Sequence, residues 1–146
     1  MANKYLIAIE LDELSAHAVL DNARHLCDST DQCDLIHVID PTSIAYAIDP
    51  TFTGKFTHDF EENAKQKAHA RMLELSAPYD LPNCSAHVRI GHVAHEIRKL
   101  LSEDGYTALM IGSHGRRGWQ RLLGTHAARI VTTAPLDTWV FKVPER

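Results

Sequence analysis

The stretch Ile111-Gly112-Ser113-His114-Gly115-Arg116-Arg117-Gly118 decides the fold of this 146-residue chain. It follows an apolar run at 108–111 that predicts a buried strand, and it precedes Gly124-Thr125, which opens a segment with helical patterning. Glycines between a strand and a helix let the backbone approach a ligand closely, and a helix N-terminus offers unpaired N–H groups to anions. The stretch therefore predicts a phosphate-binding loop in an α/β protein.

Apolar strands and amphipathic helices alternate along the whole chain. We expect strands at 5–9, 34–40, 85–90, 107–111 and 138–143. We expect helices at 15–27, with Asp12 or Ser15 as its cap, at 60–77, from 94 to about 104, and at 126–133. Residues 41–57 show little periodicity and predict a long loop. This β-α-β-α-β-α-β-α-β order favours a single domain over 1–146, with helices on both faces of a parallel, doubly wound sheet.

Composition excludes several classes of protein. The formal net charge of −4 gives no support to a general nucleic-acid binder. The sequence shows neither the apolar core of a signal peptide nor a run of 18 apolar residues, so we expect a cytoplasmic protein without a membrane span.

Cysteines and histidines give weaker signals. Cys27, Cys33 and Cys84 form no CxxC pair, which favours reduced, buried thiols over a redox or metal role. His92 and His95 lie three residues apart, but no further ligand completes a zinc site, so we expect no metal. His37 lies in an apolar strand and is interpreted as a hydrogen-bonded core residue.

A set of motifs, in this order, resembles the universal stress protein A family over essentially the whole chain. The matching segments are 6–10 with Ser15, 35–40, Ile90-Gly91 with Glu96-Ile97, 111–118, and Leu122-Leu123-Gly124-Thr125 with the last strand. The resemblance implies a five-stranded parallel sheet with strand order 3-2-1-4-5. The first and fourth strands would then lie side by side, and ligands bind at such a topological switch point.

The resemblance also implies an ATP or ADP site, with or without Mg²⁺. The residues that match nucleotide-binding positions are Glu10, Val38, Gly112, His114, Gly115, Arg116, Arg117, Gly124 and Thr125. Arg121 adds to the basic character of the loop. Arginines can neutralise phosphate, although a solvated basic face is the alternative interpretation.

Two departures from the family pattern concern that site. Nucleotide-binding members resemble Gly-x2-Gly-x9-Gly-[Ser/Thr], whereas only eight residues separate Gly115 from Gly124 here. A deletion within a helical turn would rotate everything after it by about 100°, while a deletion within the loop would only tighten the loop. Glu10 stands where ATP-binding members usually carry Asp. It keeps the charge but is one methylene longer.

These observations predict a stress-response module that binds adenine nucleotide and acts as a switch or protector, with at most slow ATP turnover. Asp12 and His114 are the only candidates for a general base, and both have structural explanations. Trp139 and Phe141 alternate with Val140 on the last strand, and we expect an edge strand with large exposed residues, which is a candidate surface for strand pairing. Since that strand commonly builds the dimer in the family, the resemblance implies a homodimer formed through Thr138 to Val143. The alternative is a homodimer that binds no nucleotide and acts through protein partners.

Overall fold

A computed structural model describes residues 2–41, 58–113 and 136–144 of the chain. Its strands are β1 (Lys4–Ala8), β2 (Gln32–Ile39), β3 (Cys84–Ile90), β4 (Ala108–Ser113) and β5 (Asp137–Lys142). Its helices are α1 (Glu13–Leu26), α3 (His58–Ser76), the short 3₁₀ helix η1 (Ala77–Tyr79) and α4 (Val93–Glu103). The loop expected at 41–57, apart from its first residue, and the helix expected at 126–133 lie outside the described residues.

The five strands form one parallel sheet with the order β3-β2-β1-β4-β5. This is the predicted order, and it places the first strand at the centre of the sheet. Tyr5 is level with Cys33 on one side and with Ala108 on the other. Strand β5 is an edge strand, which confirms the prediction that the last strand lies at an edge of the sheet.

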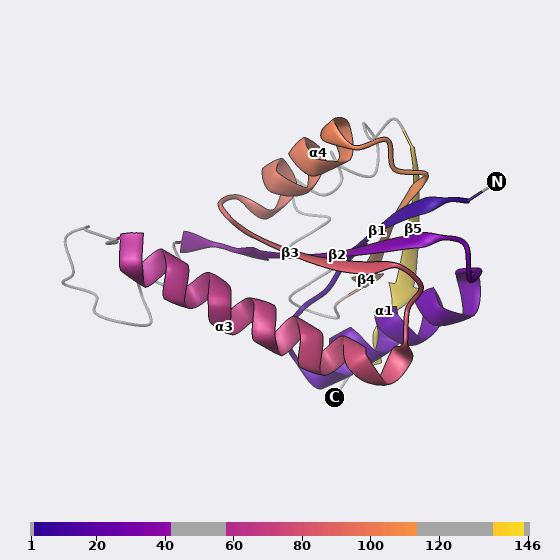
Figure 1. Cartoon of the computed structure of the whole chain (residues 1–146), viewed down its shortest axis with the longest axis horizontal. Helices are drawn as coiled ribbons and strands as arrows, with labels where there is room; N and C mark the ends of the chain where they lie inside the picture. Colours follow the sequence, from indigo (N-terminus) through magenta and orange to yellow (C-terminus); the bar gives the residue numbers. More distant parts are fainter. Residues whose placement is uncertain (1, 42–57, 114–135, 145–146) are drawn as a thin grey trace.

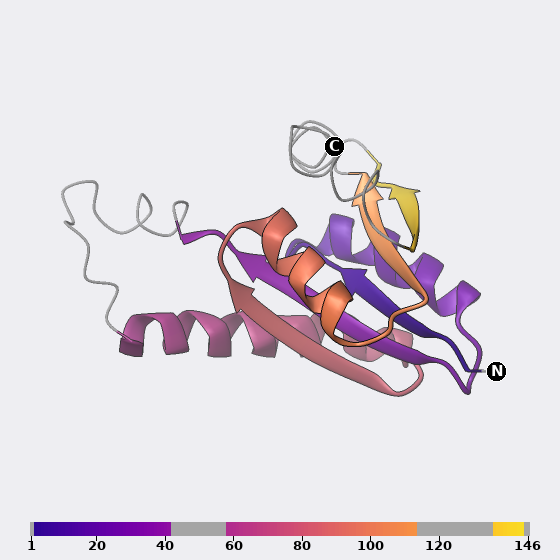
Figure 2. The ribbon, with the colours of Figure 1, turned by 90° about the horizontal axis from the view of Figure 1, so that it is seen from above.

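Helices cover both faces of the sheet, so the fold has three layers (Figure 1). Helices α1 and α3 lie on one face and α4 lies on the other, as the view in Figure 2 also shows. Alternate residues of the central strand enter the two cores. Ile7 belongs to the cluster under α1 and α3, and Leu6 belongs to the cluster under α4, both with 0% exposure. Strands buried on both faces read as continuous apolar runs, which is why the sequence revealed them.

The ends of the elements differ from the expected ones by one or two residues. Helix α1 begins at Glu13 because the Asp12 side chain accepts a hydrogen bond from the backbone N–H of Ser15 at 2.9 Å. Asp12, one of the two predicted caps, is therefore the N-cap. Strand β2 begins two residues earlier than expected, at Gln32, whose N–H donates to the carbonyl of Asn3.

Strand β5 presents a smaller apolar surface than its sequence suggested. The rings of Trp139 and Tyr5 lie 5.4 Å apart, and both Trp139 and Phe141 are half-buried against the core under α1. Among the apolar side chains of β5, Val140 is the exposed one, at 36%. Trp139 and Phe141 thus stabilise the edge strand by packing against the core under α1.

Candidate functional site

The candidate site lies where the parallel strands end, an edge that we call the carboxyl edge. Strands β1 and β4 are neighbours there, although about a hundred residues separate them in the sequence. The printed register pairs Ala8 with Ile36 and Ile7 with Met110. If both registers are continued, Glu10 falls level with Val38 on one side and with Ser113 on the other.

Glu10 has an exposed side chain two residues beyond the end of β1. The backbone just before it is fixed, because the N–H of Ile9 donates to the carbonyl of Ile36 at 3.0 Å. A ring nitrogen of His37, Nδ1, donates to the carbonyl of Ile9 at 2.9 Å. This bond confirms that His37 is a hydrogen-bonded, half-buried residue, and it shows that His37 positions the end of β1.

Val38 lies near the end of β2 and is half-buried, packed against the core under α4. Its side chain therefore has a structural role in that core. The next residue, Ile39, accepts a hydrogen bond from the N–H of Gly91 at 2.9 Å, and this bond ties β2 to the turn after β3.

Gly112 lies within β4, before the loop that follows the strand. A Cβ atom added there would lie 2.9 Å from Val19 Cγ2 and 3.0 Å from Val143 Cγ2. Real Cβ atoms do not tolerate such contacts, so this glycine is needed for close packing of α1 and the end of the chain on β4. The sequence predicted a ligand-binding glycine and missed this packing role.

The remaining predicted site residues lie outside the described residues. They are His114, Gly115, Arg116, Arg117, Gly124 and Thr125, together with Arg121. The described side of the carboxyl edge carries the acidic side chains of Glu10, Asp12 and Glu13. Asp12 is engaged as the helix cap, so the exposed carboxylate of Glu10 is the better acceptor for hydroxyl groups of a ligand.

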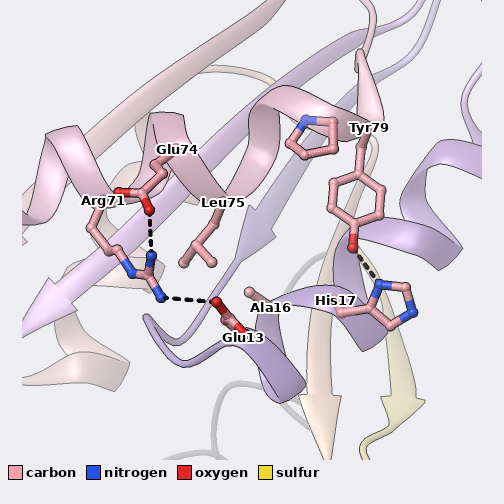
Figure 3. Close-up of a pocket in the computed structure, with 8 residues that line it drawn as sticks. Glu13, Ala16, His17, Arg71, Glu74, Leu75 and Tyr79 are labelled. Carbon is pink, nitrogen blue, oxygen red and sulfur yellow. Dashed lines mark hydrogen bonds and ion pairs between the residues drawn. The ribbon is translucent and has the colours of Figure 1, made fainter.

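A hollow of about 350 Å³ lies between α1, α3 and η1 (Figure 3). The guanidinium of Arg71 lies 3.9 Å from a carboxylate oxygen of Glu13 and 2.9 Å from one of Glu74. His17 and Tyr79 are hydrogen-bonded to each other. Arg71, the one arginine among the described residues that line this hollow, already faces two carboxylates, so an anionic ligand would have to compete with them.

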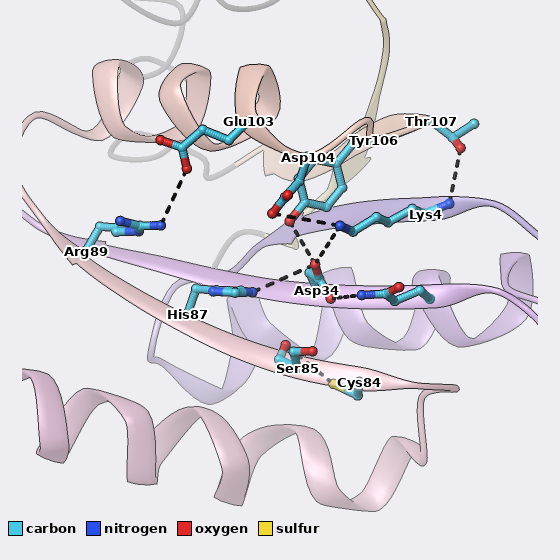
Figure 4. A network of polar contacts seen from close by, with 11 residues as sticks. Lys4, Asp34, Cys84, Ser85, His87, Arg89, Glu103, Asp104, Tyr106 and Thr107 are labelled. Carbon is cyan, nitrogen blue, oxygen red and sulfur yellow. Dashed lines mark hydrogen bonds and ion pairs between the residues drawn. The ribbon is translucent and has the colours of Figure 1, made fainter.

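A polar network that sequence reasoning missed lies at the opposite edge of the sheet, where the strands begin; we call this the amino edge (Figure 4). Asp34 is 3% exposed and accepts hydrogen bonds from the hydroxyl of Tyr106 at 2.8 Å and from Gln32 Nε2 at 3.1 Å. Lys4 Nζ and His87 Nε2 lie 3.9 Å and 3.8 Å from the same carboxylate. Burial and the Asp34 carboxylate raise the pKa of Tyr106 above its ordinary value.

Within 2–41, 58–113 and 136–144, no three His, Cys, Asp or Glu side chains gather as a metal site would require. None of the helices among those residues has the length and apolarity needed to cross a membrane.

Comparison with known proteins gives a consistent result. The sequence model of the universal stress protein family matches residues 1–142 of the chain. The chain is 28% identical over 133 residues to universal stress protein A homolog 1 of Coxiella burnetii, covering 90% of each chain.

Solved structures support the same fold. The hypothetical protein MJ0577 matches with a TM-score of 0.75 and 19% identity over 100% of this chain and 99% of that one. A universal stress protein of Archaeoglobus fulgidus in complex with dAMP matches with a TM-score of 0.64 and 13% identity over 96% and 98%. A universal stress protein in complex with cAMP matches with a TM-score of 0.63 and 15% identity over 98% of each.

Proposed function

Because the chain belongs to the universal stress protein family, we propose that it is a cytoplasmic stress-response module that binds adenine nucleotide at the carboxyl edge of β1 and β4. It acts as a switch or a protective protein, and any ATP hydrolysis is slow. The observation that carries the proposal is the position of β1 between β2 and β4, since continuing the two registers places Glu10 level with Val38 and with Ser113. The dAMP and cAMP complexes of two structural neighbours support adenine as the base.

The two sides of the proposed site contact different parts of the nucleotide. Glu10 accepts hydrogen bonds from the ribose hydroxyls, and the backbone at Val38 contacts the adenine. The phosphates lie toward Gly112 near the end of β4 and toward the predicted loop, which holds Gly115, Gly124 and Thr125. The exposed carboxylates of the described edge repel phosphate, so the arginines 116 and 117 supply the compensating charge, and His114 contacts the ligand.

The first experiment asks whether the protein carries nucleotide. Purified protein is denatured and the supernatant is assayed for released adenine nucleotide. Nucleotide-free protein is then titrated calorimetrically with ATP, ADP and AMP, each with and without Mg²⁺. We expect bound or bindable nucleotide. No released nucleotide and no heat at millimolar ATP would refute the proposal.

Variants test the two sides of the site separately. We expect Glu10→Gln to weaken binding about tenfold, because it removes a charged acceptor of the ribose hydroxyls. Glu103→Gln is the matched control, since Glu103 is also exposed but lies at the end of α4 near the amino edge, facing Arg89. Gly115→Val should abolish binding by blocking close approach of the backbone to phosphate. Binding that survives Gly115→Val unchanged would contradict the predicted loop.

A second candidate function is a homodimer that binds no nucleotide and acts through protein partners. The eight-residue spacing between Gly115 and Gly124 favours it, because a deletion within a helical turn would turn Thr125 away from the phosphates. Analytical ultracentrifugation of a nucleotide-free preparation tests it. A dimer that forms without nucleotide and does not bind ATP supports this candidate, and a dimer that requires ATP excludes it.

A further inference from the structure

The three cysteines, separate in the sequence, come together at the amino edge of the sheet. Cys27 is the C-cap residue directly after α1, Cys33 is the second residue of β2, and Cys84 is the first residue of β3. The sulfur atoms of Cys27 and Cys33 lie 3.2 Å apart, and Cys33 is the register partner of Cys84. All three are free thiols. The expectation of buried thiols is correct for Cys33 alone.

The three thiols differ in access to solvent. Cys33 is 0% exposed, inside the core under α1 and α3. Cys27 is half-buried at the surface of that core, and Cys84 is exposed. A small oxidant in solution can therefore reach Cys27 but not Cys33, and any reaction of Cys33 must pass through a neighbouring sulfur.

The turn between the two close cysteines is held by hydrogen bonds. Asp31, 2% exposed, accepts from the backbone N–H groups of Asn3 and Asp28 at 2.9 Å and 2.8 Å. Its carbonyl accepts from Asn83 Nδ2 at 2.8 Å. The N–H of Cys27 donates to Ala23 at 3.0 Å. The sulfur atoms are thus kept close, and a disulfide, at about 2.05 Å, requires them to approach by about 1.2 Å.

Electrostatics assigns different roles to the two thiols. The Cys33 thiol donates a hydrogen bond to Cys27, which lowers the pKa of Cys27, although burial, Asp31 and Asp28 oppose the effect. The same hydrogen bond and burial raise the pKa of Cys33 strongly. The pair therefore keeps its proton on Cys33 and favours a thiolate on the accessible Cys27, which is the nucleophilic form.

We propose that Cys27 and Cys33 are a redox modification site, in which a hydroperoxide oxidises Cys27 and Cys33 then closes a reversible disulfide. This function is separate from nucleotide binding, because the cysteines lie at the amino edge and the proposed nucleotide site lies at the carboxyl edge. The geometry that carries the proposal is the 3.2 Å contact between one accessible and one buried sulfur.

The reaction proceeds in two balanced steps. The Cys27 thiolate attacks the terminal oxygen of the hydroperoxide, an S–O bond forms and the O–O bond breaks. The sulfur loses two electrons to the peroxide, which leaves as an alcohol, or as water from hydrogen peroxide, after taking a proton from solvent. Cys33 sulfur then attacks the sulfenic sulfur, an S–S bond forms, and hydroxide leaves with the Cys33 proton as water. Oxidation of Cys27 removes the thiolate that held that proton on Cys33.

The test uses the full chain, fully reduced and then treated with hydrogen peroxide. We expect free thiols to fall from three to one per chain, with loss of two hydrogen atoms from the intact mass. A peptide map should link Cys27 to Cys33 within one chain, and dithiothreitol should restore both thiols. No loss of thiols, a link that includes Cys84, or a link between chains would overturn the proposal.

Matched variants separate the steps. Cys84→Ser is the control and should form the disulfide as the native chain does. Cys33→Ala should stop the reaction at a sulfenic acid on Cys27, which dimedone labels, and should slow alkylation of Cys27 by iodoacetamide. Cys27→Ser should leave Cys33 unlabelled. If Cys33→Ala fails to fold by circular dichroism, the map of the native chain decides the question alone. Dimedone labelling of Cys33 in Cys27→Ser would contradict the assigned order.

Discussion

At the scale of single residues, two side-chain environments have consequences that measurement can check. The missing side chain of Gly112 leaves space that Val19 and Val143 fill. The buried carboxylate of Asp34 accepts hydrogen bonds from Tyr106 and Gln32. Neither feature is visible in the sequence, because both depend on residues from distant segments. The glycine resembled a ligand-binding residue, and Asp34 was simply one polar residue in an apolar strand.

Gly112→Ala should destabilise the protein by about 1–3 kcal/mol, the usual cost of overpacking a well-filled core. The new Cβ would meet Cγ2 of Val19 at 2.9 Å, and a β-branched valine has little rotamer freedom with which to move away. Urea denaturation measures the change. In a double-mutant cycle with Val19→Ala, the two changes should couple, since the smaller residue makes room for the methyl group. Additive effects would show that the contact is not the cause.

Alkaline pH should weaken the fold through tyrosines that are buried (Tyr5 and Tyr106) or half-buried (Tyr79). Burial is the first cause that raises the pKa of Tyr5, Tyr79 and Tyr106, and Asp34 adds to it for Tyr106. A tyrosine in the unfolded chain ionises near pH 10. Above that pH the unfolded state binds fewer protons than the folded state, so the free energy of unfolding falls as pH rises.

The contribution of Tyr106 can be isolated with Tyr106→Phe. At neutral pH this variant should lose about 1–3 kcal/mol, because the Asp34 carboxylate loses a close donor. Above about pH 10 its stability should fall less steeply than that of the native chain. Denaturation curves at a series of pH values give both quantities. An equally steep decline would assign the alkaline effect to other groups.

At the scale of elements, the N-cap of α1 is a stabilising residue that lies beside the candidate site. Asp12 was one of two predicted caps and one of two candidate bases, and its carboxylate accepts the Ser15 N–H. We expect Asp12→Ala to cost about 0.5–2 kcal/mol of stability and Asp12→Asn to cost much less, because asparagine is also a good cap. Thermal and urea denaturation of both variants check this. Equal losses in the two variants would mean that the negative charge, and not the cap, matters.

Most elements could be predicted because their signals are local. Strand β1 is a continuous apolar run, and α4 carries apolar residues at helical spacing. The resemblance to universal stress proteins implied the strand order, and the observed sheet confirms that order. The family match confirms the resemblance itself. The approach of Cys27 to Cys33 could not be predicted in this way. It depends on how the turn after α1 folds back, with Asp31 anchored by Asn3 and Asn83.

The candidate site was predictable only in part. Strands β1 and β4 are neighbours, as the resemblance implied, and continuing the two registers beyond β1 places Glu10 level with Val38 and with Ser113. The phosphate side remains a prediction, because Gly115, Gly124 and the residues between them lie outside the described residues. Side-chain direction in β5 was the weakest inference, since Trp139 faces the core and Val140 faces out.

At the scale of the whole molecule, the predicted homodimer depends on the edge strand β5. Val140 is 36% exposed on that strand, so a charge placed there would be desolvated in a dimer formed by strand pairing. We expect Val140→Asp to weaken dimerisation at least about tenfold while leaving the fold intact. Sedimentation equilibrium measures the dissociation constant, with Lys142→Asp reporting the general effect of charge at the edge. An unchanged dimer in Val140→Asp would place the interface elsewhere.

The central position of β1 also determines the order in which the sheet can form while the chain is being synthesised. Its first edge can pair with β2 once about forty residues have left the ribosome, but its second edge waits for β4, which ends at Ser113. Until then a growing chain presents an unpaired apolar strand flanked by half-formed cores, which is an aggregation hazard. Nascent chains that stop before Ala108 should therefore bind chaperones strongly, and release should coincide with the emergence of β4.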